Sequence, residues 1–542
     1  MNTHASLDGA EEGRDERAAT LSGLMRLLFV SPRVARSSQP WAERCNPFGI
    51  DRNGLAPQKL VALGLQTCAT LWQHASSFSL LLVMLAGCSV GPNYQAPKLK
   101  MAAAWSEAGP GGTTNRAAEF TQWWKTFDDP VLDSLIERAV KSNYDLKAAA
   151  ARLRAGRALR GAAVADLFPT LDANASYTKA RRSQNALSFL VRQLDTDTYQ
   201  VGFDATWEID VFGGKRRALE AANADLQAVE EDRRTVLVSL LAEVARNYVE
   251  LRGTQRRLAI ARENLRAQQE AVEITQQRFN AGLVSELDVA QAKAVLAATK
   301  SQVPSLQTAE KQSMHTLSVL LGQPPAALQA ELEKEAPIPP TPPEVPTGLP
   351  ADLLKRRPDV RRSERQLAAA NARIGVAVAE FFPKFSLTGM AGYQSLETGN
   401  LISPASQFWT AGPSVRWRLL EYPRLRAQVL SQSAQQDQAL AQFGQAVLTS
   451  LADVENALVA YGNEKEGYRA LDDEVAANRL ALELANQIYT QGRGEFLNVL
   501  DAERSLYLAE DALAQSRLTV TLNLVALYKA LGGGWESEAK AK

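Results

Sequence analysis

The sequence predicts a mainly α-helical protein that contains an internal duplication and four amphipathic strands. Three observations lead to this fold class. Apolar residues recur every seven positions between Ala218 and Gly282, the same pattern returns 210 residues later, and each half has two stretches of alternating apolar and polar residues. A heptad pattern keeps an apolar seam on one side of a supercoiling helix, whereas strict alternation puts apolar side chains on one face of a strand.

The heptad stretch predicts one very long helix. It contains no proline, and about 60 residues at roughly 1.5 Å each would span about 90 Å. Such a helix is too long for one compact core and must pack along other long helices. The heptad positions are Leu237, Val244, Leu251, Leu258, Leu265, Val272 and Phe279, and their counterparts are Val447, Val454, Tyr461, Tyr468, Val475, Leu482 and Tyr489. Gly282 likewise corresponds to Gly492, so we interpret the pattern as a tandem duplication rather than two unrelated amphipathic helices.

Composition excludes several function classes. The 542-residue chain has 60 Lys and Arg against 60 Asp and Glu, so its net charge is zero and does not indicate nucleic-acid binding. It has three histidines, and the spacing of Cys45, Cys68 and Cys88 matches no zinc site. We therefore expect no metal, no cofactor and no catalytic residues of the His or Cys type.

The N-terminal region ends in a short apolar run. Residues 1 to about 58 lack periodicity, and we expect them to be disordered. Phe78 to Leu85 form an apolar run too short to span a bilayer as a helix, which is typical of a secretory signal. Leu85 to Cys88 resemble a bacterial lipobox, which implies that residues 1–87 are removed and that Cys88 is lipidated; the alternative is a buried cysteine in a short helix. Ser89 then favours the outer membrane. A translation start assigned too early would explain the long leader.

The first repeat is expected over residues 130–325, after an extended segment at 88–129. Asp129 and Pro130 are suited to start a helix that runs to about 166 and is interrupted near Asn143. Strands follow near 171–177 and 199–210. The long helix then ends at Gly282, and Ser285 caps a returning helix that we expect to break near Pro304.

The second repeat is expected over residues 351–535. A linker at 326–350 precedes it, with seven prolines between residues 337 and 350. The strands are Phe385 to Tyr393 and Trp409 to Leu419. Residues 536–542 are charged, and we expect them to form a disordered tail.

Four strands of about 9 to 12 residues suit a transmembrane barrel but cannot close one. Open strand edges are not tolerated in lipid, so the chain must oligomerise unless the sheet is soluble. Three copies would supply twelve strands, and the helices would form a second tube. The polar faces of the strands would line the barrel with charges of mixed sign, which are Asp204, Glu208, Asp210, Arg416 and Arg418.

Four motifs together resemble the TolC-like outer-membrane efflux proteins, and the lipobox favours the NodT/OprM-type lipoproteins among them. The motifs are Trp123 to Pro130, Arg278 to Ser285, Asp359 to Pro383, and Tyr528 to Trp535. The resemblance implies a homotrimer with a twelve-stranded barrel in outer-membrane lipid and a long periplasmic α-helical coiled-coil barrel. It also implies docking to a periplasmic adaptor (membrane fusion) protein and to an inner-membrane pump of the RND type. Glu421 to Pro423 depart from the Asp-Gly-Gly turn often found after the fourth strand.

The function expected from this reading is a passive exit duct for drugs, metals or other small molecules. The chain lacks a phosphate-binding motif in a strand–helix unit, so a partner must supply the energy. A coiled-coil scaffold would share the heptads but would not explain the strands. An enzyme is the third reading, and we find no nucleophile–base constellation for it.

Two groups of residues are the candidate functional sites. The helix turns farthest from the strands are the expected adaptor-docking tips, with Gly282, Leu283, Val284 and Ser285 in one and Gly492, Arg493, Gly494 and Glu495 in the other; the alternative is that they only close helical hairpins. The resemblance implies a periplasmic gate at Leu497 and Asp501, one helical turn apart. The alternative is that Leu497 fills the coiled-coil seam and Asp501 is a solvated charge.

Overall fold

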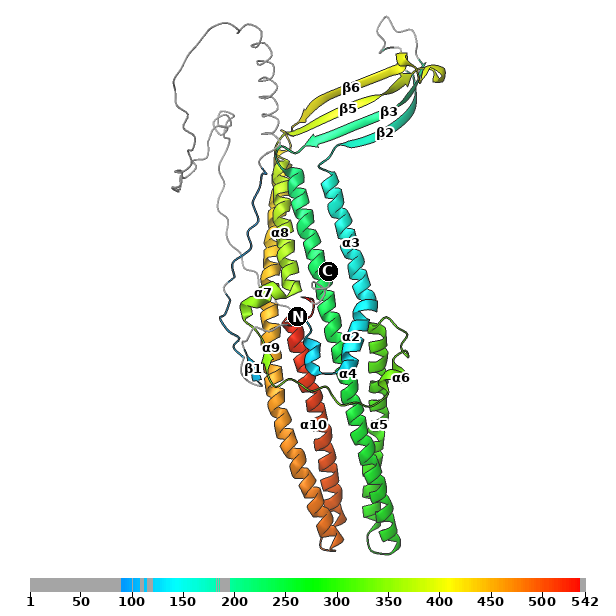
Figure 1. Ribbon diagram of the computed structural model, residues 1–542, viewed down its shortest axis with the longest axis vertical. Coiled ribbons are helices and arrows are strands. Elements are labelled where there is room, and N and C mark those ends of the chain that lie inside the picture. Colours follow the sequence, from blue (N-terminus) through cyan, green and yellow to red (C-terminus); the bar gives the residue numbers. More distant parts are fainter. Residues whose placement is uncertain are drawn as a thin grey trace, which may run out of the picture. The chain divides into compact units, whose positions relative to one another are not determined.

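The computed structural model describes residues 89–99, 101–107, 112–114, 120–181, 183, 185 and 195–536. All of them belong to one unit of the chain, His74–Lys542. The expected signal segment 1–87, Cys88 and residues 537–542 of the expected tail lie outside the described residues. Within this unit, a four-stranded sheet lies at one end of the long helices and two helix turns lie at the other (Figure 1).

The first half of the unit has the predicted order of helix, two strands, long helix and returning helix. Its elements are α2 (Pro130–Ser142), α3 (Tyr144–Ala165), β2 (Thr170–Arg181), β3 (Asp195–Ile209), α4 (Gly214–Asn280) and α5 (Glu286–Leu320). The first helix breaks at Asn143 as predicted, because the side chain of Asn143 accepts a hydrogen bond from the backbone N–H of Leu146 and caps α3. With 67 residues, α4 spans about 100 Å at roughly 1.5 Å per residue.

The second half repeats these elements at the offsets read from the sequence. Its elements are α8 (Pro358–Ala379), β5 (Lys384–Ser395), β6 (Gln407–Arg416), α9 (Tyr422–Thr490) and α10 (Phe496–Ala530). The bounds of α8 and β5 lie 214 residues after those of α3 and β2, and the bounds of α10 lie 210 residues after those of α5. The offset changes within the strand pairs, so the helix turns correspond in the two halves, while the long helices differ slightly in length, with 67 residues in α4 and 69 in α9.

Two expected element ends are wrong. Helix α5 continues through Pro304, which is exposed, so the carbonyl that loses its hydrogen bond there faces water while the helix packs against α4 on its other side. Strand β6 ends at Arg416 instead of Leu419. The reason is that Arg416 pairs with Lys384, the first residue of β5, so the residues after Arg416 have no strand partner.

The sheet has the order β2-β3-β5-β6, and all its pairs are antiparallel. Its register places the alternating residues of the four strands on common faces. One face carries Leu171, Tyr177, Val201, Phe203, Leu387, Trp409 and Val415, and the other carries Asp172, Asn174, Gln200, Asp204, Glu208, Thr388 and Ser414. Within the described part of the chain, β2 and β6 each pair along one edge only.

Strands β3 and β5 approach each other closely at one point of the polar face. Gly202 pairs with Gly392, and both occupy polar-face positions. A Cβ on Gly392 would overlap the carbonyl oxygen of Val201, and a Cβ on Gly202 would overlap that of Ala391. There is therefore no room for a side chain at this point of the polar face, and glycine in a strand often marks such a close backbone approach.

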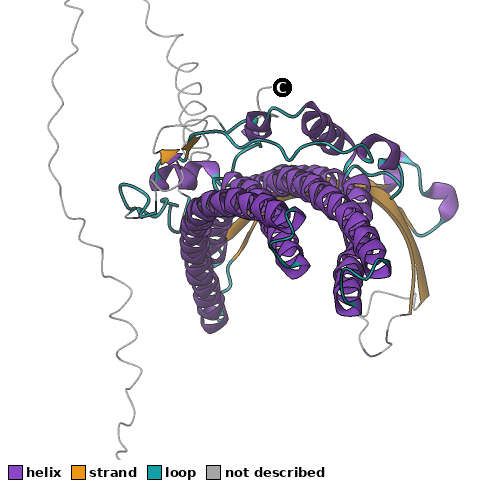
Figure 2. Ribbon diagram, turned by 90° about the horizontal axis from the view of Figure 1, so that it is seen from below, coloured by secondary structure: helices purple, strands orange, loops and turns teal. Residues whose placement is uncertain are grey.

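Seen along their length, the long helices follow an arc, and the short helices and loops lie along its outer side (Figure 2). The main core lies at mid-length around the short 3-10 helix η2 (Trp123–Phe127), where Trp123 and Phe127 are buried. Trp123 stacks on Tyr528 of α10 at 5.2 Å between ring centres. Tyr248 of α4 donates a hydrogen bond to Asp129 at 2.7 Å. The core therefore joins α4, α10 and the start of α2.

The linker between the repeats packs across the helices at this level. It contains α6 (Gln329–Leu332), β4 (Val345–Pro346) and, beyond it, α7 (Leu353–Arg356), and β4 pairs in parallel with β1 (Thr113–Thr114). Gln255 of α4 donates to the carbonyl of Leu332 at 2.8 Å. Ile338 packs against Val249 of α4 and Leu518 of α10. The proline-rich segment thus holds the two repeats together.

Among the residues described, no helix is long and apolar enough to cross a membrane.

Candidate functional site

The first helix turn is built by a glycine cap. Gly282 has φ 73°, and the N–H groups of Gly282 and Leu283 donate to the carbonyls of Phe279 and Arg278 at 2.9 Å each. This is the six-to-one and five-to-two pattern that ends a helix, and it requires a residue that tolerates positive φ. Ser285 and Asp288 then form the predicted capping box at the start of α5. Leu283, at the apex, is 73% exposed.

The second helix turn repeats this construction. Gly492 has φ 72°, and Arg493 N–H donates to the Ile488 carbonyl at 3.1 Å. A Cβ on Gly494 would lie 2.8 Å from the exposed side chain of Ile488, which would have to shift to accommodate it. Arg493 and Glu495 are exposed, and Val284 of the first turn is half-buried.

The two hairpins contact each other next to their turns. The guanidinium of Arg278 in α4 lies 4.4 Å from the ring centre of Tyr489 in α9, and Tyr489 lies 5.3 Å from the ring of Phe496 in α10. A small apolar cluster continues this contact between the hairpins, with Val272, Ala292, Leu482, Phe496, Val499 and Leu500. Both turns therefore belong to one apical surface formed by α4, α5, α9 and α10.

Leu497 and Asp501 lie on the side of α10 that this cluster leaves open. Phe496, Val499 and Leu500 are buried, whereas Leu497 is 40% exposed and Asp501 is exposed. In the described part of the chain, Asp501 has no hydrogen-bond or ion-pair partner. Leu497 therefore does not fill the seam within one chain, and both residues are available to line a passage formed with other copies.

The structure separates the five charged residues expected along the barrel. Asp204 and Glu208 are in β3 and Arg416 is in β6, all on the polar face. Asp204 accepts a hydrogen bond from Asn174 across the strand pair, and Glu208 lies 3.9 Å from Lys215.

Asp210 and Arg418 lie outside the strands, which corrects their expected placement. Asp210 follows β3, and its carboxylate accepts hydrogen bonds from the backbone N–H groups of Lys215 and Arg216, at 3.2 and 2.8 Å, so it caps α4. Arg418 follows β6 and forms an ion pair with Glu380 of the α8–β5 turn at 3.5 Å. Both side chains fasten the sheet to the helices.

The described chain begins where the sheet meets the helices. Ser89 packs against Gly213, and Val90 N–H donates to the carbonyl of Phe212 at 3.1 Å. Arg217 of α4 holds this start, donating to the carbonyl of Val90 at 3.0 Å and to Asn93 at 2.7 Å. Residue 89, directly after Cys88, is therefore fixed beside the base of the sheet.

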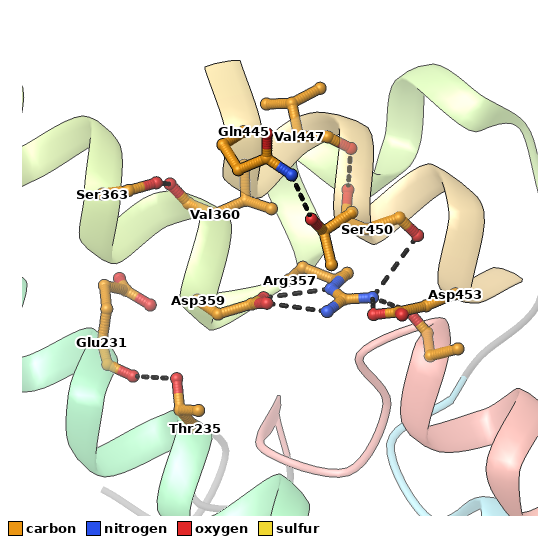
Figure 3. Close-up of polar contacts among 12 residues, drawn as sticks. Glu231, Thr235, Arg357, Asp359, Val360, Ser363, Gln445, Val447, Ser450 and Asp453 are labelled. Carbon is orange, nitrogen blue, oxygen red and sulfur yellow. Dashed lines mark hydrogen bonds and ion pairs between the residues drawn. The ribbon is translucent and has the colours of Figure 1, made fainter. Parts of the chain in front are cut away.

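Sequence reasoning gave no role to Arg357, which joins three helices (Figure 3). Its guanidinium makes two hydrogen bonds with Asp359, at 3.0 and 2.7 Å, and a third with Asp453 of α9 at 3.0 Å. It also donates to the carbonyl of Ala530, the last residue of α10, at 3.1 Å. Although burial favours the neutral acid, Arg357 holds the pKa of Asp359 below its usual value. An arginine directly before a Pro-Asp helix start was the signal in the sequence.

Comparisons with known proteins fit this geometry. The family profile of the outer membrane efflux protein matches residues 135–323 and 349–533, which are the two repeats. The solvent efflux pump outer membrane protein SrpC of Pseudomonas putida is 34% identical over 84% of this chain and 97% of its own length. The nodulation protein T of Rhizobium leguminosarum bv. trifolii is 33% identical over 86% of this chain and 97% of its own.

The structural comparison agrees. The outer-membrane channel OprN superposes with a TM-score of 0.78 at 39% identity, covering 83% of this chain and all of the channel. The resemblance inferred from the four motifs is confirmed. The chain belongs to the outer membrane efflux protein family.

Proposed function

We propose that this chain is the outer-membrane exit duct of a tripartite efflux system, through which drugs, metals or other small molecules leave the cell passively. The observation that supports this most directly is the sheet. It has one polar and one apolar face, open edges, and apolar side chains such as Phe203 and Trp409 that are 57% and 79% exposed. Such a sheet is stable in lipid only when its edges are paired and its apolar face meets acyl chains.

Three copies would satisfy both conditions. Strand β6 of one copy would pair with β2 of the next, giving twelve strands around a polar lumen that contains Asp204, Glu208 and Arg416. The arcs of long helices would join in the same way into a periplasmic tube.

The partners of the duct follow from its passive role. We infer that an inner-membrane pump, of the RND type, supplies the energy, and that a periplasmic adaptor docks on the apical surface at Gly282–Ser285 and Gly492–Glu495. The exposed Leu283 and Arg493 are the side chains best placed for that contact. Bulky substitutions there should abolish resistance to exported drugs while trimers persist; unchanged resistance with both sites altered would exclude docking there.

The cargo belongs to the broad class of small molecules handled by the relatives. Those relatives include a solvent efflux pump protein of Pseudomonas putida and a pyoverdine export protein of Pseudomonas aeruginosa. We propose no single substrate, because the charges on the polar face of the sheet are of both signs.

We also propose a lipid anchor at Cys88 after removal of residues 1–87. The support is the lipobox-like sequence and the position of Ser89 at the base of the sheet, where a barrel would meet the periplasmic leaflet. The mature chain would then comprise the segment 88–129, the repeats 130–325 and 351–535 joined by 326–350, and the tail 536–542. A Cys88→Ser variant should incorporate no labelled palmitate, and labelling equal to wild type would refute the anchor.

Reconstitution in planar bilayers tests the duct itself. The purified chain should form trimers that conduct ions, with a conductance that depends on the polar-face charges. A coiled-coil scaffold would bind partners without conducting. Absence of conductance from correctly assembled trimers, also in the gate variants described below, would contradict the proposal.

A further inference from the structure

A cavity of about 730 Å³ lies at mid-length between α4 and α8, and the duct does not use it. It is lined by α4, α7, α8, one residue of α9 and the N-terminal segment. Its side chains include Phe443 and Leu354, four cations and three carboxylates. The volume falls within the roughly 300–1,000 Å³ typical of sites for small ligands.

Glu231 of α4 is the buried polar group of this cavity. Its side chain is 6% exposed, and its Oε1 accepts from Arg234 at 2.5 Å and from Arg361 at 2.8 Å. Figure 3 shows the side chain reaching from α4 toward the first turns of α8. Its Oε2 is also buried and has no hydrogen-bond partner among the described residues. A buried acceptor oxygen without a hydrogen-bond donor favours a ligand that donates an N–H or O–H group.

The cations of the cavity are held in place apart from one. Arg234 and Arg361 stack on the ring of Trp535, at 4.6 and 5.3 Å, and Arg365 pairs with Glu364. Lys355, at the exposed rim, has no ion-pair partner in the part of the chain that the structure describes. Four cations against three carboxylates leave one positive charge, which favours a ligand with one anionic group.

We propose that this cavity binds a short peptide with a free carboxyl end, whose carboxylate pairs with Lys355 and whose N–H group donates to Oε2 of Glu231. The apolar side chains of Phe443 and Leu354 would contact the rest of the peptide. Glu231 lies 17 residues beyond Gly214, or about 25 Å along α4 from the sheet. The ligand therefore comes from the aqueous phase, either as a soluble peptide or as a peptide stem of the cell wall.

Calorimetry on the full chain in detergent, with trialanine as the probe, tests the site. Wild type should bind trialanine saturably, whereas trialanine amide, which lacks the carboxylate, should bind at least about fivefold more weakly. Lys355→Ala should lower the affinity for trialanine by the same factor, and Glu231→Gln should lower it about tenfold. The exposed Lys300→Ala is the matched control and should bind as wild type does.

Co-sedimentation with purified cell-wall sacculi distinguishes the two sources. Retention of wild type but not of Lys355→Ala assigns the site to cell-wall stems, and trialanine binding without such retention assigns it to soluble peptides. No saturable binding of trialanine, or equal binding by wild type and Lys355→Ala, overturns the proposal. Because Lys355 is exposed, that variant should fold even if Glu231→Gln does not. Ion conductance should be unchanged in both variants, so absence of peptide binding would not contradict the proposed export duct.

Discussion

Arg357 is one residue on which three helices depend. Its guanidinium is mostly buried and satisfied by Asp359, Asp453 and the carbonyl of Ala530. Replacing it with alanine leaves two carboxylates and a helix C-terminus without their shared donor. We expect Arg357→Ala to lower the free energy of unfolding by about 3 kcal/mol, measured by chemical denaturation of the purified protein.

Arg152→Ala is the matched control for this change. Arg152 pairs with Asp232 at 2.7 Å, but its side chain is 57% exposed. Solvent screens such a pair, so we expect a loss below about 1 kcal/mol. Equal losses in the free energy of unfolding would show that the burial of Arg357 does not increase its contribution to stability.

Glu503 is a second residue whose environment sets a measurable property. It lies on α10 between Leu500, which packs near Val272, and Tyr507, which packs against Ile260. It therefore faces the stretch of α4 between Ile260 and Val272, where buried polar atoms of Asn264 and Gln268 also lack partners in the described structure. Burial raises the pKa of Glu503 above its usual 4.5.

The raised pKa fixes the direction of a pH dependence. An acid whose pKa is raised by folding stabilises the folded state at low pH, and this contribution is lost as pH rises through the folded pKa. Glu503→Gln should therefore be more stable than wild type at pH 7, by on the order of 1 kcal/mol, and should gain less on acidification from pH 7 to pH 5. Thermal unfolding at both pH values measures this, with the exposed Glu474→Gln as control. A variant no more stable than wild type at pH 7 would rule out the burial argument.

At the scale of elements, features set by local signals could be predicted from the sequence, whereas features set by tertiary contacts could not. Asp129, Asn143, Ser285 and Gly282 act on backbone groups within a few residues of themselves, so their helix ends could be predicted. The end of β6 could not, because it depends on where β5 begins. Pro304 predicts a break because its energetic cost is local, whereas the packing of α5 on α4, which keeps the helix continuous, is a tertiary effect. The cavity joins residues far apart in the sequence, and no pattern within one element indicates it. The arginine before the Pro358-Asp359 helix start indicates a local pair with Asp359, but not the contact with Asp453, which lies 96 positions away.

Because of the duplication, the gate residues of the second repeat can be compared with their counterparts in the first. Leu497 and Asp501 of α10 correspond to Leu287 and Gln291 of α5, and Leu287 is 63% exposed. If threefold rings of Leu497 and Asp501 close the passage, Leu497→Ala with Asp501→Ala should raise single-channel conductance several-fold and admit large antibiotics such as vancomycin. Leu287→Ala with Gln291→Ala should change conductance much less, because this position lacks the carboxylate. Wild-type conductance in the first double variant would show that the gate lies elsewhere.

At the scale of the whole molecule, the described chain is incomplete by itself. Within the described chain, the outermost strands of the sheet each keep one unpaired edge, and large apolar side chains on one face, such as Leu171, Phe203 and Trp409, are exposed. Unpaired edges and exposed apolar faces are costly in both water and lipid. We therefore propose that the chain buries what it exposes against copies of itself and against a membrane. The sequence indicates this requirement through alternation alone, while the register that places the residues on common faces is visible only in the paired sheet.

This requirement predicts opposite outcomes for neighbouring positions of β3. Phe203 lies on the apolar face and is 57% exposed, whereas Thr206 lies on the polar face and is also exposed. If the apolar face meets acyl chains, Phe203→Arg should destabilise the folded protein in lipid by about 2–4 kcal/mol, because it places a charge near the middle of the bilayer. Thr206→Arg should fold and assemble as wild type does and should shift the conductance toward anions, since it adds positive charge to the lumen. Denaturation in liposomes and bilayer recordings measure the two effects. If Thr206→Arg proves the destabilised variant and Phe203→Arg alters selectivity, the sheet faces the membrane the other way round.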